Sequence, residues 1–129
     1  MENNTSNDNV SLILPARREY VSTARLTASS IANRLGFNID EVEDIKVAVS
    51  EVCNILLAKE TDETIRYRIN FAINGNMLTI TFEGENAPLN CMKDSFENEY
   101  GLYIMQALMD SVELCSDSKS IVMTKKIGE

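Results

Sequence analysis

The side chains that most often do chemistry in proteins are scarce in this sequence. It contains no histidine, which removes the commonest general base and the commonest metal ligand. Its three cysteines, Cys53, Cys91 and Cys115, are widely spaced and form no Cys-x-x-Cys pair, so we do not expect a zinc site. We interpret them as partly buried thiols of a protein in a reducing cytosol.

The charge balance narrows the classes of partner. Twenty acidic and twelve basic residues give a net charge of −8, which repels phosphate backbones and argues against nucleic-acid binding. The first residues are polar and acidic and lack the basic and apolar parts of a signal peptide. No apolar run is long enough to span a membrane. We therefore expect a cytoplasmic protein that binds neither nucleic acid nor membrane.

The spacing of apolar residues predicts one domain of the α+β class. Residues 1–9 are expected to be disordered and residues 10–129 to form a single domain with its own core. Periodicity predicts helices over about 18–35, 40–59 and 100–110, and strands over 11–14, 64–73, 77–82, 111–115 and 120–126. This order predicts a two-layer sandwich, in which a mostly antiparallel sheet of about five strands is covered on one face by three helices.

Turn and cap residues divide these elements. Pro15 ends the first strand, Gly36 ends the first helix, and Asn38 or Asp40 can cap the second helix. The run Asn74-Gly75-Asn76 predicts a hairpin turn. Residues 83–99 show no period and contain Gly84 and Pro88, so we expect a loop there.

Several segments of the chain resemble one known family. Ser50-Glu-Val-Cys53 and the third helix, Tyr100–Asp110, look like the anti-sigma-factor serine kinases of bacteria, which belong to the GHKL (histidine-kinase-like) ATPase superfamily. Glu19–Ala28, Asp44–Glu51 and the terminal Met123-Thr-Lys are similar to the same family in the same order, so the resemblance spans about residues 11–127. It implies ATP and magnesium as cofactors, a homodimer, and partner switching. A partner-switching kinase holds a sigma factor inactive and phosphorylates a serine of an anti-anti-sigma protein.

The resemblance implies a catalytic role for Glu51, but the magnesium ligand that accompanies this glutamate in the family is absent from the sequence. Glu51 matches the family carboxylate that orients or deprotonates the attacking hydroxyl. The family's magnesium ligand is an asparagine four residues later on the same helical face, and that position here is Ile55, which has no oxygen to offer. Asn54 is adjacent but lies roughly 100° around the helix from that position. Glu51 can equally be a solvated helix carboxylate.

The adenine-binding turn of the family is also altered. The aspartate that accepts a hydrogen bond from the adenine amino group is replaced by Phe82, which we interpret as a core aromatic residue. Gly84 of the same turn remains. Glu83 is one residue away, and a one-residue shift on a strand points a side chain to the opposite face.

The phosphate-binding loop departs from the family in charge as well as in glycine content. Of the glycines that approach the phosphates before the third helix, only Gly101 remains, followed by Leu102. Glu99 places a carboxylate where polyphosphate charge would lie. Residues 83–99 contain five acids and one base, and like charges about 4 Å apart repel by roughly 4 kcal/mol at an effective dielectric of 20.

A protein-binding surface is predicted on the first helix. Arg25 matches a family arginine that faces the protein partner, and Arg17, Arg18 and Arg34 are expected to join it in a basic patch. A solvated helix face is the alternative. Met105 and Met109 are predicted to pack in the core, and a methionine-lined partner groove is the alternative.

These expectations favour one hypothesis over two rivals. The leading one is a dimeric regulator that sequesters a sigma factor or an anti-anti-sigma protein, with weak or lost ATP binding and no bound cofactor. The first rival is an active serine kinase that uses ATP and magnesium, with Glu51 as base, Asn54 as a shifted magnesium ligand, and Gly84 and Gly101 as backbone platforms. The second is a dimeric scaffold without a sigma partner.

Overall fold

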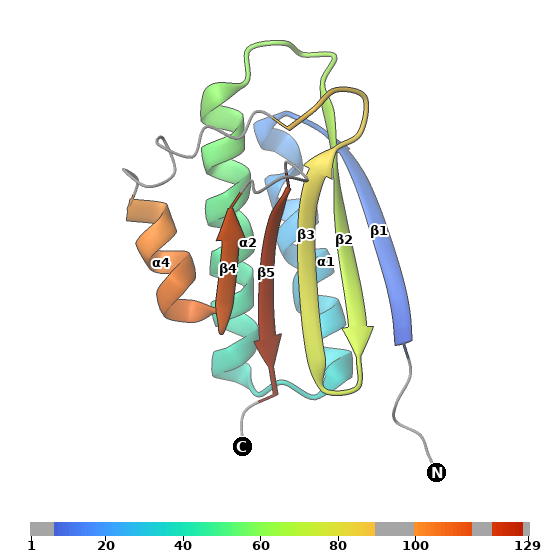
Figure 1. Ribbon diagram of the computed structural model, residues 1–129, viewed down its shortest axis with the longest axis vertical. Coiled ribbons are helices and arrows are strands. Elements are labelled where there is room, and N and C mark those ends of the chain that lie inside the picture. Colours follow the sequence, from blue (N-terminus) through green and yellow to red (C-terminus); the bar gives the residue numbers. More distant parts are fainter. Residues whose placement is uncertain (1–6, 90–99, 115–119, 128–129) are drawn as a thin grey trace.

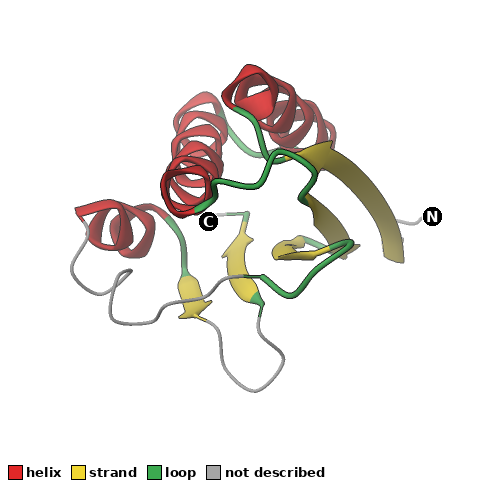
Figure 2. Ribbon diagram, turned by 90° about the horizontal axis from the view of Figure 1, so that it is seen from above, coloured by secondary structure: helices red, strands yellow, loops and turns green. Residues whose placement is uncertain are grey.

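The protein is a sheet covered on one face by helices, as Figures 1 and 2 show. The computed structural model describes residues 7–89, 100–114 and 120–127. Within them one five-stranded sheet has the order β1-β2-β3-β5-β4, and every neighbouring pair of strands is antiparallel. The predicted α+β two-layer fold is therefore confirmed.

The elements follow the predicted order. The strands are β1 (Asn7–Pro15), β2 (Arg66–Asn74), β3 (Met77–Gly84), β4 (Ser111–Leu114) and β5 (Ile121–Lys126). The helices are the single turn η1 (Arg18–Tyr20), α1 (Val21–Leu35), α2 (Ile39–Lys59) and α4 (Tyr100–Leu108). Among the described residues, no helix combines the length and apolar character needed to cross a membrane.

The start of β1 corrects one expectation. Residues 7–9 were predicted to be disordered because they are polar, but they pair with the end of β2, from Asn7 opposite Asn74 onward. Backbone pairing with a neighbouring strand does not require apolar side chains, so composition alone missed it. Residues 1–6 of the expected tail lie outside the described residues.

The predicted stop and turn signals act as expected. Gly36 ends α1 with φ +99°, and Gly75 forms the β2–β3 turn with φ +60°, a region that favours glycine. Asn38, and not Asp40, caps α2. Its side chain accepts a 2.8 Å hydrogen bond from the Glu41 N–H, and the Glu41 side chain accepts a 2.9 Å bond from the Asn38 N–H.

The core lies between the sheet and the helices. Alternate residues of β2 and β3 are fully buried, among them Ile69, Phe71 and Ile80, and α2 covers them with a stripe that includes Ile45, Val49 and Val52. Met105 is fully buried and Met109 is 5% exposed, so both pack in the core as predicted. Neither methionine lines an open partner groove.

The C-terminal end of α4 is held against β5. Lys125 Nζ donates a hydrogen bond of 2.5 Å to the carbonyl of Leu108, the last residue of α4, where a cation suits the helix dipole. The next turn is fixed by Asp110, whose N–H donates to the Thr124 carbonyl and whose carboxylate accepts from the Lys126 N–H. These bonds orient α4 along the sheet.

A buried polar contact joins α2 to β2. The Tyr67 hydroxyl donates to Cys53 Sγ at 3.4 Å, and both residues are buried. Burial raises the pKa of the Cys53 thiol to about 11, and burial together with Cys53 raises the pKa of Tyr67. Cys91 and Cys115 lie outside the described residues. The described part of the chain holds no cluster of three or more acidic, cysteine or histidine residues suited to a metal.

The raised thiol pKa predicts an alkaline loss of stability. The folded state favours the neutral thiol of Cys53. The thiol therefore contributes its full stabilisation below pH 9, the pKa of a cysteine in the unfolded chain, and this stabilisation is lost as the pH rises toward 11. Over that range we expect Cys53 ionisation to lower the free energy of unfolding by up to about 3 kcal/mol. Urea unfolding of wild type and Cys53→Ala at several pH values measures it. The variant should lose distinctly less stability between pH 9 and pH 11. Parallel losses in the two proteins would contradict the assignment.

Candidate functional site

The structure brings Glu51, Ile55 and Gly101 into direct contact where α2 and α4 pack together. A Cβ atom built on Gly101 would lie 2.7 Å from Ile55 Cδ1 and 2.9 Å from Glu51 Oε1. Heavy atoms that are not hydrogen-bonded do not approach this closely, so a side chain at position 101 would require the ends of the Ile55 and Glu51 side chains to move aside. Gly101 and its neighbour Leu102 are both buried.

The negative charge of Glu51 is favourable at its position beside the N-terminus of α4. Its side chain is half-buried, and its carboxylate lies against the first turn of α4, which carries no acidic residue of its own. A negative charge near a helix N-terminus is favourable, by about 0.3–1 kcal/mol at exposed sites. With Lys125 at the other end, α4 has complementary charge at both ends.

Ile55, which the resemblance assigns to the magnesium-ligand position, faces the same contact. Ile55 is 7% exposed and packs on Gly101, one helical turn from Glu51. The side chain there is hydrocarbon, whereas magnesium requires oxygen ligands. Asn54 is exposed, on the neighbouring face of α2.

At the end of β3, the residue that the resemblance assigns to the adenine-binding aspartate is part of the core. Phe82 is completely buried, which confirms its interpretation as a core aromatic residue. Glu83 follows it and pairs in register with Arg68, on the face of the sheet away from the helices. Its carboxylate therefore cannot replace the family's aspartate on the helix-covered side.

Gly84 lies under the loop that follows it. A Cβ atom on Gly84 would be 1.7 Å from the carbonyl oxygen of Ala87 and 2.9 Å from the backbone nitrogen of Leu89. The backbone of the chain itself thus occupies the space that the missing side chain leaves. Gly84 serves this close return of the loop.

Polar anchors hold that loop in place. Asn86 Oδ1 accepts a 2.9 Å hydrogen bond from the Arg66 N–H, and its amide donates to the Thr64 carbonyl at 2.8 Å. The Glu85 carboxylate pairs with the Arg66 guanidinium at 2.9 Å. Sequence analysis missed these residues, and the only signal for them was the turn-forming composition of residues 84–88.

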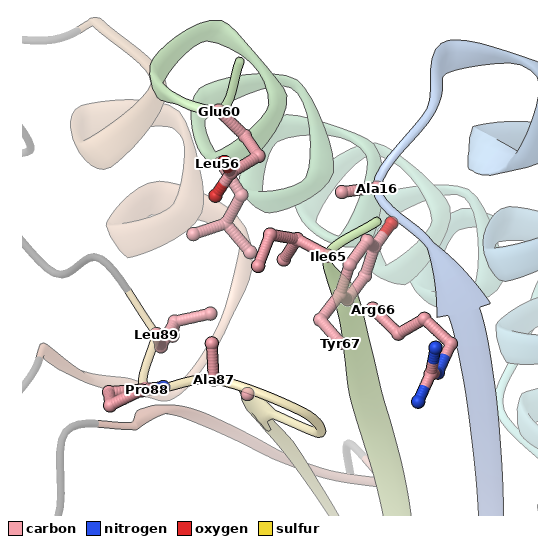
Figure 3. A pocket seen from close by; sticks show the side chains of 10 residues that line it. Ala16, Leu56, Glu60, Ile65, Arg66, Tyr67, Ala87, Pro88 and Leu89 are labelled. Atoms are coloured by element: carbon pink, nitrogen blue, oxygen red, sulfur yellow. The ribbon is translucent and has the colours of Figure 1, made fainter. Parts of the chain in front are cut away.

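Within the described residues, a small cavity lies beside the loop residues Ala87 and Leu89 (Figure 3). It encloses about 20 Å³, room for a single water molecule and far less than an adenine ring needs. Its walls combine the C-terminal part of α2 with the start of β2 and the loop, including Leu56, Ile65, Tyr67, Ala87 and Leu89. Glu99 and the rest of residues 90–99, which include most of the expected acidic lid, lie outside the described residues.

The four arginines do not form one patch. Arg17 and Arg18 are exposed and line a polar cleft of about 350 Å³ between η1 and the α2–β2 connection. Arg25 is half-exposed on α1. Arg34 lies nine residues further along α1, roughly 14 Å away, and lines a different groove with Asp8. Arg34 therefore does not belong with the other three.

The chain matches known proteins over nearly its full length. Residues 14–125 match the family model described as a histidine kinase-like ATPase domain. The serine-protein kinase RsbW of Halalkalibacterium halodurans is 32% identical over 134 aligned positions, which cover 92% of this chain and 83% of that protein. The serine-protein kinase RsbW of Bacillus thuringiensis is 32% identical over 137 positions, covering 93% of this chain and 86% of that protein.

A solved structure shares the fold. The crystal structure of the RsbU and RsbW domains of Rv1364c from Mycobacterium tuberculosis superposes with a TM-score of 0.62. The aligned residues are 15% identical and cover 92% of this chain and 31% of that one. At this identity the likeness concerns the arrangement of helices and strands alone.

The packing at Gly101 predicts an energetic coupling to Ile55. Gly101→Ala places a methyl group against Ile55 Cδ1, which must move aside, and should lower the free energy of unfolding by about 1 kcal/mol. Ile55→Val removes that Cδ1 atom, so in this background the same change should cost clearly less. Urea unfolding of wild type, Gly101→Ala, Ile55→Val and the double variant measures the coupling free energy between positions 101 and 55. Ile45→Val, the same change at another buried position of α2, is the control background and should not relieve the cost. Equal costs in all three backgrounds would show that the predicted contact is absent.

Proposed function

The chain belongs to the histidine kinase-like ATPase domain family, and from this membership we propose that it is a partner-switching regulator of transcription that has weak or lost ATP binding. In this proposal it works by binding and sequestering a sigma factor or an anti-anti-sigma protein. The observation that carries the proposal is the contact of Gly101 with Ile55 and Glu51. The contact supports the proposal because the resemblance assigns the cation ligand to position 55, and the side chain there is an isoleucine that packs against Gly101.

Three features together support loss of the nucleotide. Magnesium lacks an oxygen ligand at Ile55, and the adenine amino group lacks an acceptor at Phe82. Each missing partner in a buried site costs on the order of 1–3 kcal/mol. The backbone of Ala87 occupies the space beside Gly84. The residues present thus fit a magnesium–nucleotide complex poorly, and we derive no catalytic step through one.

The partner-binding role rests on surfaces other than the altered site. Arg25 on α1 matches the family arginine that faces the protein partner, and Arg17 and Arg18 line the neighbouring cleft at the start of the same helical segment. Arginine is enriched among residues that dominate binding energy. The cleft of Arg17 and Arg18 also contains Glu19, Glu60, Asp62 and Glu63, so it carries both signs of charge. Arg25 lies outside this cleft and is the cation that we propose meets an acidic group of the partner protein. We place this function in the cytoplasm, where a sigma factor acts, and we propose that the regulator is a homodimer.

The rival function is an active serine kinase, since the relatives at 32% identity are named serine-protein kinases. Glu51 is present and would act as base, with Asn54 as the magnesium ligand. Transfer of labelled phosphate from ATP to an anti-anti-sigma protein, abolished by Glu51→Ala, would support this rival. Under our proposal no transfer occurs above the background of the Glu51→Ala variant.

The proposed binding surface predicts a position-dependent effect of charge reversal. Arg25→Glu should weaken binding to the cognate sigma factor or anti-anti-sigma protein by tenfold or more, because it reverses the charge of the arginine that we propose faces the partner. Arg34→Glu makes the same change on the same helix but in a different groove, and it should change affinity less than twofold. Surface plasmon resonance with the purified candidate partners measures both. Equal effects of the two reversals would exclude a specific role for Arg25.

A further inference from the structure

The helix α4 is apolar or aromatic on all its sides, although one side faces solvent. Its nine residues, Tyr100–Leu108, include no charged side chain, and Gln106 contributes the one side-chain amide. A helix with apolar residues all round normally lies inside a protein or a membrane. The inner side of α4 meets this expectation, because Gly101, Leu102 and Met105 are buried. The outer side does not.

Three large side chains lie on the outer side of α4. Tyr100 is 85% exposed, Tyr103 is 62% exposed and Ile104 is 36% exposed. Positions i, i+3 and i+4 share one face of a helix, so these residues form a continuous stripe, which we call the outer stripe of α4. It holds three of the eight large apolar side chains that are exposed in the described part of the chain, although α4 is its shortest α-helix. Contiguous exposed apolar surface of this kind is typical of an interaction site.

The position of α4 leaves the outer stripe open. The helix lies at the end of the helical layer, beyond α2 and next to the short strand β4 (Figure 1). The outer faces of the other two helices are mostly polar, with Ser30 and Asn33 exposed on α1 and Glu43 and Asn54 exposed on α2. A further helix placed beside α4 would extend the layer and cover the stripe.

The charges beside α4 favour a basic partner. Glu51 lies against its first turn, Asp44 lies two turns earlier on the same face of α2, and Asp110 follows its last turn. The ammonium group of Lys125 is bonded to the Leu108 carbonyl. An apolar stripe bordered by carboxylates is complementary to an apolar face that is bordered by Lys or Arg. Tyrosine rings add to this preference, because their faces attract cations.

We propose that the outer stripe of α4 is the docking site for an amphipathic helix of another protein, one with an apolar face and basic residues along the borders of that face. The apolar face of the docked helix covers Tyr100, Tyr103 and Ile104. Its basic residues lie near Glu51 and Asp110. A lipid surface is a poorer occupant, because these carboxylates and the net charge of −8 repel anionic headgroups.

This site is distinct from the partner surface proposed on α1. The helix α2 lies between α1 and α4 (Figure 1). Arg25 on α1 is proposed to meet an acidic group, whereas the stripe on α4 selects a basic and apolar one. The inference therefore goes beyond the proposed partner switching, and it requires no nucleotide.

Two synthetic helical peptides with the same leucine face test the docking site. One carries lysine along the borders of that face, and the other carries glutamate at the same positions. In fluorescence anisotropy, the lysine peptide should bind the wild type with a micromolar Kd, and the glutamate peptide should bind about tenfold more weakly or worse. A lysine peptide that does not bind at submillimolar protein, or equal binding of the two peptides, overturns the proposal.

Matched lysine substitutions separate the site from general attraction between the acidic protein and a basic peptide. Tyr103 and Leu26 are 62% and 61% exposed, on α4 and on α1, and each substitution adds the same single positive charge. Tyr103→Lys should weaken binding of the lysine peptide by about tenfold, because it removes a ring from the centre of the stripe. Leu26→Lys should weaken it by less than about twofold. Equal losses in the two variants overturn the proposal.

Two measurements on the unmodified protein complete the test. In hydrogen exchange, the lysine peptide should raise amide protection along α4 and leave α1 unchanged, and the reverse result overturns the proposal. In sedimentation with phosphatidylcholine–phosphatidylglycerol vesicles, the protein should stay in the supernatant. Binding to the vesicles would assign the stripe to a lipid surface instead. None of these experiments involves a sigma factor, so failure of the docking site can be distinguished from failure of the partner-switching function.

Discussion

The close approach of α2 and α4 is the constraint from which the rest of the site follows. It exists because residue 101 has no side chain, so the backbone of α4 rests directly on Ile55 and Glu51. Lys125 at the far end of α4 and the buried Met105 beneath it hold the helix in that position. The side chain of Ile55 fills this contact with hydrocarbon, which offers no oxygen ligand to a magnesium ion.

Gly84 and Gly101, which the resemblance assigns to the nucleotide-binding motifs, both lie where the chain packs closely on itself. Gly84 allows the loop to return over the end of β3, and Gly101 allows two helices to touch. Glycine permits a close approach of backbone to a ligand and of backbone to protein for the same steric reason. Retention of these glycines is therefore consistent with a protein that keeps the family fold and acts, as we propose, through protein surfaces.

The sequence predicted the fold well because apolar residues recur every second position along the strands and every third or fourth position along the helices. The alternation along β2 and β3 and the stripe on α2 placed the core correctly, and Gly36 and Asn74–Asn76 placed the turns. It predicted Phe82 in the core for the same reason. It could not predict β1 from Asn7, since backbone pairing left no apolar pattern. Nor could it predict the contact of Gly101 with Ile55 or the anchoring of Asn86 by Arg66 and Thr64, which join residues far apart in sequence.

Calorimetric titration with Mg-ATP tests the central claim most directly, because it asks whether the space around Gly84 and Gly101 accepts a nucleotide. Wild type and Glu51→Ala are titrated side by side, with a catalytically active serine-protein kinase of the family as the positive control. Our account predicts no saturable heat from either form of this protein at submillimolar nucleotide. A micromolar dissociation constant for the wild type would contradict it, whether or not Glu51→Ala keeps that affinity.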